Sequence, residues 1–131
     1  MEDTVFISYI YFEKEQTMQN LKLFLRHGLN KNTTMFLTVR GKLSINIDEY
    51  LNKIVVLKTD NIGFDYGGHK DVLNMIDTKE YDYFILMNDG NVGPFYKKSN
   101  GFWYDMFKAK INDSVKVVGQ NIRRILGPRK K

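Results

Sequence analysis

The sequence predicts an α/β fold of the Rossmann type, with a mostly parallel sheet that carries helices on both faces. Three observations indicate this fold. Apolar and β-branched runs alternate along the chain with segments of helical periodicity. The first run, residues 4–12, is apolar almost throughout, which is typical of a strand buried on both faces. Two polar loops, residues 60–68 and 88–90, directly follow predicted strands, where open parallel sheets bind their ligands.

The first half of the chain carries three predicted strands and one long helix. After the strand over 4–12, apolar residues recur at helical spacing from Met18 to Leu29, so we expect a helix over 15–29. Gly28 and the polar residues 30–32 end that helix. Further apolar runs predict strands over 34–39 and 53–57, with a helical turn over 48–51 between them.

The second half begins with a loop over 60–68, where three glycines fall within nine residues. A helix over 69–76 and a strand over 81–87 are expected next, and that strand runs straight into Asn88 and Asp89. The remaining pattern predicts a loop over 91–100, an amphipathic helix over 101–111 and a short fifth strand over 115–118.

Length and composition favour one folded domain, residues 1–122, followed by a basic tail at 123–131. The chain has no cysteine, which excludes disulfides and thiolate metal sites and favours a reducing compartment. The N-terminus carries acid where a signal peptide carries base, and no apolar run approaches the ~18 residues of a membrane span. We therefore expect a cytoplasmic protein, in the host cytoplasm or the virion if the source is viral, without a transmembrane segment.

The net charge of +5 by itself suggests a nucleic-acid or anionic membrane partner. Five of the twenty basic residues lie in the segment 123–131, and the other fifteen are balanced by fifteen acidic residues. A neutral body lacks the basic face that phosphate-backbone binding requires, so we expect no nucleic-acid binding and a solvated tail. The alternative hypothesis is a module that uses this basic tail to bind nucleic acid or membranes.

Asn88 and Asp89 stand at the end of an apolar strand, where a side chain is held rigidly and still reaches solvent. A carboxylate there suits Mn²⁺ or Mg²⁺, which prefer oxygen ligands and often take only one or two of them from the protein. Such a cation neutralises the charge on a leaving nucleoside diphosphate. The alternative is an ordinary strand-end turn, because Asn, Asp and Gly are common turn residues.

Asp65 lies in a glycine-flanked loop that opens a predicted helix. Gly67 and Gly68 permit close backbone approach, and a helix start offers N–H groups to an anion. Asp65 is equally suited to cap that helix without any ligand. The two histidines and the absence of cysteine argue against zinc. Trp103 either stacks on a sugar or packs one helix face.

Several segments resemble, in the same order, one family of glycosyltransferases found in polysaccharide-synthesis clusters and large DNA viruses and related to rhamnan-synthesis proteins. The stretch 60–68 (DNIGFDYGG) resembles the family's N-x-G-x-D-x-G stretch, and 81–89 (YDYFILMND) resembles the strand leading into its DxD-equivalent site. The similarity covers roughly residues 4–122, and the other matching positions are 9–14, 20–21, 24–28, 93–95, Trp103, Phe107 and 115–119.

The resemblance implies the nucleotide-binding half of a GT-A fold, with a nucleotide-diphosphate sugar as donor, a glycan or glycoprotein as acceptor, and Mn²⁺ or Mg²⁺ as cofactor. Asp89 would contact the metal, although Asn88 replaces the first acid of the usual motif. The residues it places near the nucleotide sugar are Tyr11, Glu13, Asn61, Gly63, Asp65, Gly67, Gly68, Asn88 and Asp89, and those near the acceptor are Gly93, Pro94, Phe95 and Trp103.

Family members continue through further strands and helices, whereas this chain stops soon after residue 122. We therefore expect a truncated form in which the acceptor-binding half is missing or much reduced. Two functions follow: an active glycosyltransferase of polysaccharide or glycan biosynthesis, or an inactive nucleotide-sugar-binding remnant or subunit that another chain completes. An uncovered apolar surface at the shortened end also predicts self-association.

Overall fold

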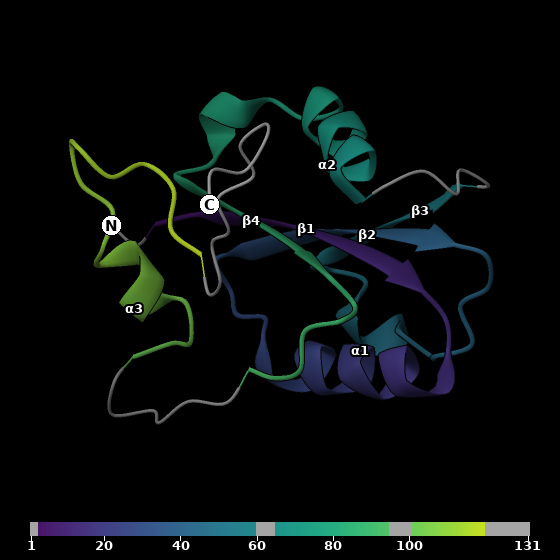
Figure 1. Cartoon of the computed structure of the whole chain (residues 1–131). Helices are drawn as coiled ribbons and strands as arrows, with labels where there is room; N and C mark the ends of the chain where they lie inside the picture. Colours follow the sequence, from purple (N-terminus) through teal and green to yellow (C-terminus); the bar gives the residue numbers. More distant parts are fainter. Residues whose placement is uncertain (1–2, 60–64, 95–100, 120–131) are drawn as a thin grey trace, which may run out of the picture. The chain divides into compact units, whose positions relative to one another are not determined.

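The computed structural model describes residues 3–59, 65–94 and 101–119, and it divides the chain into two compact units, residues 1–94 and 95–131. The described part of the first unit is an α/β structure with one four-stranded parallel sheet (Figure 1). Its elements are, in order, β1 (Val5–Phe12), α1 (Glu15–His27), β2 (Thr33–Arg40), η1 (Asp48–Tyr50), β3 (Ile54–Thr59), α2 (Asp65–Asn74), η2 (Thr78–Glu80) and β4 (Tyr83–Asn88).

The strands lie in the order β3-β2-β1-β4, which is the order of the first four strands in the Rossmann fold. The chain moves outward from β1 through β2 to β3, and α2 then returns it across the sheet to β4. Figure 1 shows α1 on one face of the sheet and α2 on the opposite face. The predicted fold class, a parallel α/β sheet with helices on both faces, is therefore confirmed.

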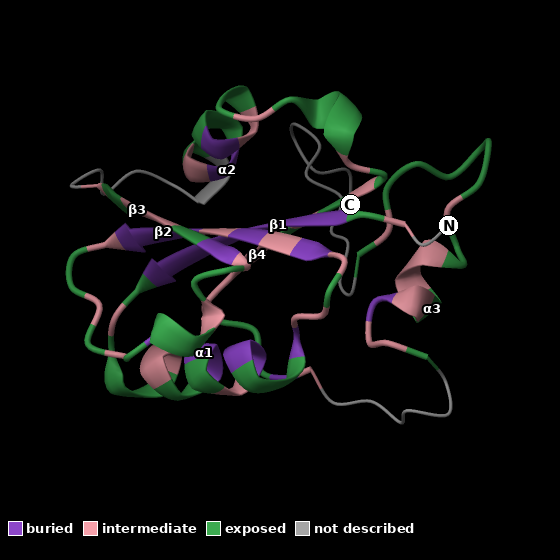
Figure 2. Cartoon of the chain, turned by 180° about the vertical axis from the view of Figure 1, so that it is seen from behind, coloured by how far each residue is buried: buried purple, intermediate pink, exposed green. Residues whose placement is uncertain are grey.

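Strand β1 is the centre of the core. Its first seven residues are all buried, and only Phe12 at its carboxyl end is exposed. Figure 2 shows that the buried residues gather along the sheet, between the two helices. The strand has β2 on one side, β4 on the other and a helix over each face, so none of its side chains meets water before the sheet ends. This surrounding explains why residues 5–11, apart from Ser8, are apolar or aromatic without the alternation of a half-exposed strand.

Alternation along the strands decides which helix each side chain of the sheet meets. The ring of Tyr9 lies 5.3 Å from that of Phe24 on α1, so the odd-numbered residues of β1 face α1. Ser8 Oγ lies 2.7 Å from His69 Nδ1 on α2, so the even-numbered residues face α2. The parallel register extends this division across the sheet.

Helix α2 begins at Asp65, whereas the sequence predicted a loop up to residue 68 and a helix from 69 to 76. The glycine cluster had suggested a loop, but Gly68 lies inside the helix. A Cβ atom on Gly68 would stand only 2.9 Å from Ile10 Cδ1. Gly68 thus lets the helix approach the sheet closely, which is a packing requirement rather than a turn.

The described part of the second unit contains one short helix, α3 (Asp105–Lys108), instead of the predicted helix over 101–111. The Asp105 carboxylate accepts the Phe102 N–H at 2.8 Å, so the first residue of the helix closes the turn that precedes it. The predicted strand over 115–118 is wrong. Asn112 Oδ1 accepts the N–H groups of Ser114 and Val115, and this turn uses the backbone groups that a strand would need.

Candidate functional site

The carboxyl ends of all four strands lie at one edge of the sheet, because the strands are parallel. The last cross-strand row on the α2 face joins Phe12, Arg40 and Thr59 at the ends of β1, β2 and β3. Asn88 ends β4 and is the Cα partner of Ile10. Ligands of open α/β sheets bind at this edge, at the point where the strand order reverses. In this sheet that point lies between β1 and β4.

Asp89 is held at this reversal point by three hydrogen bonds. Its N–H donates to the carbonyl of Ile10 at 3.1 Å. Its carboxylate Oδ2 accepts the Phe12 N–H at 2.6 Å. Its backbone carbonyl accepts the side-chain amide of Asn20 at 2.8 Å. The carboxylate of this half-buried residue is thus tied to the end of β1. It accepts the hydrogen bond of the Phe12 N–H, which β4 does not pair at that end of the strand.

Asn88 takes part in a tight turn rather than standing as a second open ligand. Its Oδ1 accepts the Gly90 N–H at 2.9 Å, and its backbone carbonyl accepts the side chain of Asn91 at 3.1 Å. The strand-end turn that the sequence allowed is therefore present. The turn uses the side chain of Asn88 and leaves the Asp89 carboxylate beside the end of β1. The turn is therefore compatible with a ligand-binding role for Asp89.

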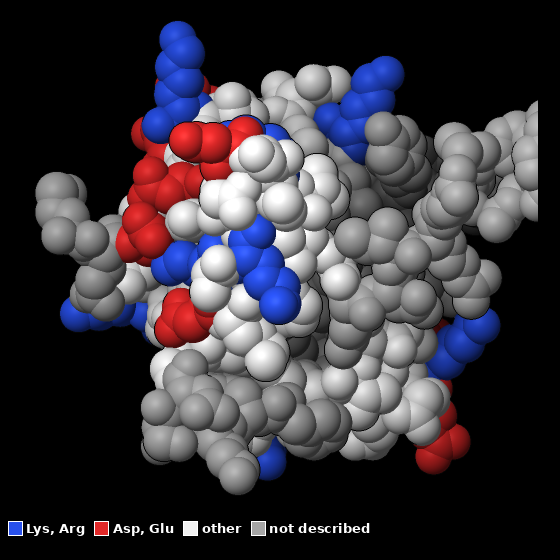
Figure 3. Space-filling view, turned by 60° about the vertical axis from the view of Figure 1, so that its left-hand side comes forward, with Lys and Arg blue, Asp and Glu red and all other residues white. Residues whose placement is uncertain are grey.

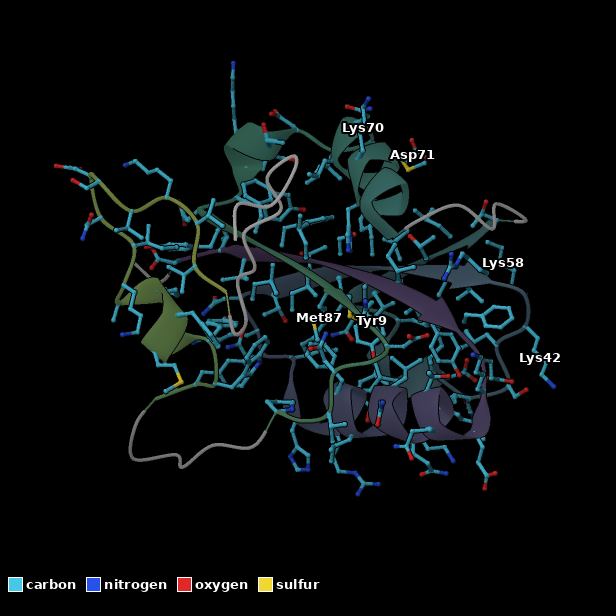
Figure 4. All side chains as sticks on the ribbon, in the orientation of Figure 1. Tyr9, Lys42, Lys58, Lys70, Asp71 and Met87 are labelled. Atoms are coloured by element: carbon cyan, nitrogen blue, oxygen red, sulfur yellow. The ribbon has the colours of Figure 1, made fainter. Side chains whose placement is uncertain are left out.

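Two buried tyrosines of β1 face α1 close to Asp89. Burial is the main cause that raises the pKa of Tyr9, and the negative charge of Asp89 adds to it. Burial also raises the pKa of Tyr11, and its hydrogen bond to Glu13 and the charges of Glu13 and Asp89 act in the same direction. Figure 4 shows Tyr9 beside Met87 on the α1 side of the sheet. Both phenols therefore stay protonated.

Glu13 connects the loop after β1 to the loop after β2. Its Oε1 accepts the Tyr11 hydroxyl and the Ser44 N–H, both at 2.9 Å, and its Oε2 accepts the Ser44 hydroxyl at 2.7 Å. The side-chain bond from Ser44, followed by its backbone bond, lowers the pKa of Glu13. Tyr11 is fully buried, so it contributes to the edge only through its hydrogen bond to Glu13. Glu13 itself is half-buried.

A pocket of about 350 Å³ lies on the α2 face, over the carboxyl ends of β2 and β3. Thr38 stands in its floor with 7% of its surface exposed, and its hydroxyl has no hydrogen-bond partner among the described residues. Figure 4 shows Lys58 and Asp71, two of its charged residues, at this end of the sheet. The lining residues are Ile10, Thr38, Arg40, Val56, Leu57, Lys58, Thr59, Gly68, Asp71, Val72 and Met75.

Sequence analysis missed most of this pocket. Thr38, Arg40 and Thr59 are polar residues at the ends of two predicted strands, and this position was the one signal that pointed to them. Gly68 is the predicted residue that lines the pocket, and it also approaches Ile10. Because Ile10 pairs with Asn88 and bonds to Asp89, the start of α2 and the end of β4 both approach the same residue of β1.

The other predicted site residues lie in several places. Asn61, Gly63 and Phe95, and the side chain of Asp65, lie outside the described residues. Gly67 is exposed near the start of α2, and Gly93 and Pro94 end the described part of the first unit. Trp103 belongs to the second unit, where its ring lies 5.4 Å from that of Tyr104 and 6.4 Å from that of Phe107.

Searches with this chain found no matching family model, no significant match among curated proteins and none among solved structures. The site must therefore be interpreted from its own chemistry. Within the described ranges, no group of three or more His, Cys, Asp or Glu residues could hold a metal ion. Likewise, no helix in that part of the chain is long and apolar enough to cross a membrane.

Charged side chains of both signs lie together on the face shown in Figure 3. Lysine and arginine stand next to aspartate and glutamate there, so the described side chains of that face do not make a uniformly basic surface. Phosphate-backbone binding depends on such a surface. The lining of the pocket differs from this mixed surface, because it contains two cationic side chains, Arg40 and Lys58, and one carboxylate, Asp71.

Proposed function

We propose that this chain binds a nucleotide-diphosphate sugar at the carboxyl edge of its sheet, with Mn²⁺ or Mg²⁺. It then acts as a glycosyltransferase of polysaccharide or glycan biosynthesis, or as the donor-binding half of one. The observation that carries this proposal is the arrangement around the end of β1. Asp89 is fixed on the β4 side of that strand, and a pocket lined by both polar and apolar residues opens on its β2 and β3 side. Both lie at the carboxyl edge of the sheet, where open α/β sheets bind ligands, and Asp89 lies at the reversal of strand order.

An elongated ligand suits these two features. Neighbouring strands lie about 4.8 Å apart, so β4 and β3 are about 14 Å apart. We assign the base and ribose to the pocket over β2 and β3, and the diphosphate to the end of β1 near Asp89. Phe12 lies between them, because its N–H bonds to Asp89 and its Cα partner Arg40 lines the pocket. Its exposed ring and the Lys14 ammonium, 5.8 Å from the ring centroid, offer stacking and positive charge to the ligand.

The metal fits this site under one condition. Asp89 offers a single carboxylate, and its Oδ2 already accepts the Phe12 N–H. Mg²⁺ and Mn²⁺ often bind through one or two protein carboxylates and complete their shell with phosphate and water oxygens. Asp89 would therefore hold the cation only together with the diphosphate. When bound, a divalent cation neutralises the charge that develops on the leaving diphosphate.

The remaining chemistry needs an acceptor hydroxyl of a glycan or glycoprotein, placed against the donor sugar and deprotonated. Gly93 and Pro94 are the described residues of the first unit that we propose for the acceptor side. The edge itself contributes binding and orientation through Phe12, Lys14 and the pocket. The Asp89 carboxylate, held against the end of β1, contributes the negative charge that a metal–diphosphate complex needs.

Calorimetry with UDP and with GDP, each with and without Mn²⁺, tests the proposal. We expect Mn²⁺ to tighten binding of one of the two, and Asp89→Asn to remove at least about tenfold of that gain. Asp89→Asn keeps an oxygen that accepts the Phe12 N–H, so its folding should change little. Asp89→Ala loses both the charge and this bond, and it should also be less stable. Equal Mn²⁺-dependent binding by the wild type and Asp89→Asn would refute the metal assignment.

A second candidate function is a nucleotide-sugar-binding remnant, or a subunit that another chain completes. The observation that favours it is the outer edge of β4, which pairs with no other strand within the described residues. Phe84 and Leu86 of that strand are 39% and 46% exposed. Mn²⁺-dependent nucleotide binding without donor hydrolysis or sugar transfer, by protein shown to be folded, would favour this function over an active enzyme.

A further inference from the structure

We infer that Asn20 of α1 is a positioning residue for Asp89, an inference that rests on the proposed function. Asn20 is only 4% exposed and stands among the apolar residues with which α1 packs on the sheet. An amide at such a place is unfavourable unless its polar atoms are satisfied. Here both are: Nδ2 donates to the carbonyl of Asp89 at 2.8 Å, and Oδ1 accepts Gln16 Nε2 at 2.9 Å.

The bond from Asn20 completes the control of the backbone at residue 89. The bond from the Asp89 N–H to Ile10 fixes one side of the residue, and the bond from Asn20 to the Asp89 carbonyl fixes the other. The peptide groups on both sides of Asp89 are thereby held, one from β1 and one from α1. The bond from Phe12 then sets the direction of the carboxylate.

Such control matters for a cation site with a single protein carboxylate. When several residues bind a metal, one displaced ligand is partly compensated by the rest. With one carboxylate, a displacement of the peptide moves the whole protein contribution. Residues that orient ligands from behind typically change metal affinity by about 10–100-fold when they are removed. A displacement of about 1 Å can cost about a hundredfold in a reaction.

The merely structural alternative is that Asn20 only satisfies a buried carbonyl. The two interpretations differ in what the amide controls. A structural amide affects stability and leaves the coupling between Mn²⁺ and nucleotide unchanged. A positioning amide affects that coupling even when the protein remains folded. Gln16 offers a further distinction, because it lies on the exposed side of α1 and holds the orientation of the Asn20 amide.

The test is calorimetry with UDP and GDP, with and without Mn²⁺, on the wild type, Asn20→Leu, Gln16→Leu and Leu25→Ala. Leu25 is a buried residue of α1, so its truncation is a matched control for lost stability. Asn20→Leu should lose about 10–100-fold of the Mn²⁺-dependent gain and keep its metal-free nucleotide affinity. Gln16→Leu should lose a few-fold of the gain, and Leu25→Ala should keep it.

Each outcome separates this inference from the proposed function. If the wild type shows no Mn²⁺-dependent gain, the proposed function fails. If the wild type shows the gain and Asn20→Leu retains it, or Leu25→Ala loses as much, Asn20 is structural and the inference is overturned. If Asn20→Leu does not fold, Gln16→Leu decides, and an unchanged Mn²⁺ gain in that folded variant refutes the inference.

Discussion

Two adjacent glycines at the start of α2 provide a direct test of how the helix packs on the sheet. A Cβ atom on Gly67 would meet nothing within 4 Å, whereas a Cβ atom on Gly68 would stand 2.9 Å from Ile10 Cδ1. Both glycines lie in the same helix, so Gly67→Ala and Gly68→Ala gain similar helix propensity. The difference between the two variants therefore measures the contact with Ile10 alone.

The magnitude follows from these two effects. Replacing a helical glycine by alanine stabilises a helix by up to about 1 kcal/mol, and Gly67→Ala should approach that gain. Gly68→Ala receives the same gain, but Ile10 is 2% exposed and must move to admit a methyl group. Overpacking of this kind typically costs about 1–3 kcal/mol. Because the contact involves the end of the Ile10 side chain, which borders a pocket, we expect Gly68→Ala to be less stable than Gly67→Ala by about 1 kcal/mol, the low end of this range.

Urea denaturation of the two variants and the wild type measures this difference in the free energy of unfolding. The packing argument is refuted if both alanines stabilise the protein equally. Ile10 also lines the pocket, so its displaced methyl group has the pocket as its nearest space. Gly68→Ala should then weaken nucleotide binding as well, and calorimetry on the folded variant checks this second effect.

Three further predictions concern other parts of the sheet. Ser8→Ala removes the hydroxyl bonded to buried His69 and should lower the free energy of unfolding by about 1–3 kcal/mol in urea denaturation. The hydrogen bonds from Ser44 lower the pKa of Glu13, so their stabilisation is present above its ordinary value of 4.5 and is lost as the pH falls below it. The stability difference between the wild type and Glu13→Gln should thus shrink from about pH 6 to about pH 3, and a constant difference would contradict this. Leu86→Lys should reduce self-association in light scattering without lowering stability, because Leu86 is 46% exposed on an edge strand; a monomeric wild type at high concentration would contradict it.

The sheet could be predicted from the sequence because its residues are constrained twice, by strand preference and by burial. Residues 4–12 form an apolar run that only a central strand can bury on both faces, and β1 occupies that position. The second unit gave no such constraint. Residues 115–118 have strand preference, but Asn112 bonds to the neighbouring N–H groups and forms a turn instead. Local hydrogen bonds there prevail over a weak intrinsic preference.

The site was only partly predictable. Asp89 stood out because a charged residue directly follows an apolar strand. The pocket did not, because Thr38 and Arg40 share one face only through the alternation of β2, and Thr59 joins them only through the register with β3. The partner of Asn20 was equally invisible, since residues 20 and 89 are brought together by the packing of α1 on the sheet. Such pairings depend on the tertiary fold rather than on a local pattern.

The order of the two residues Asn88 and Asp89 decides what the end of β4 can do. Residue 88 is still in the strand and is the partner of Ile10, so its side chain belongs to the row that faces α2. Leu86, the residue of the same row that lies opposite Ser8, is 46% exposed, so this row of β4 is open to water. Residue 89 lies one position beyond the strand, where its carboxylate reaches the N–H of Phe12 at the edge. The charge is thus placed beside the end of β1, and the amide at residue 88 forms the turn that follows. Exchanging the two residues would move the charge from the Phe12 N–H to the turn at Gly90, although the composition of the chain would be unchanged.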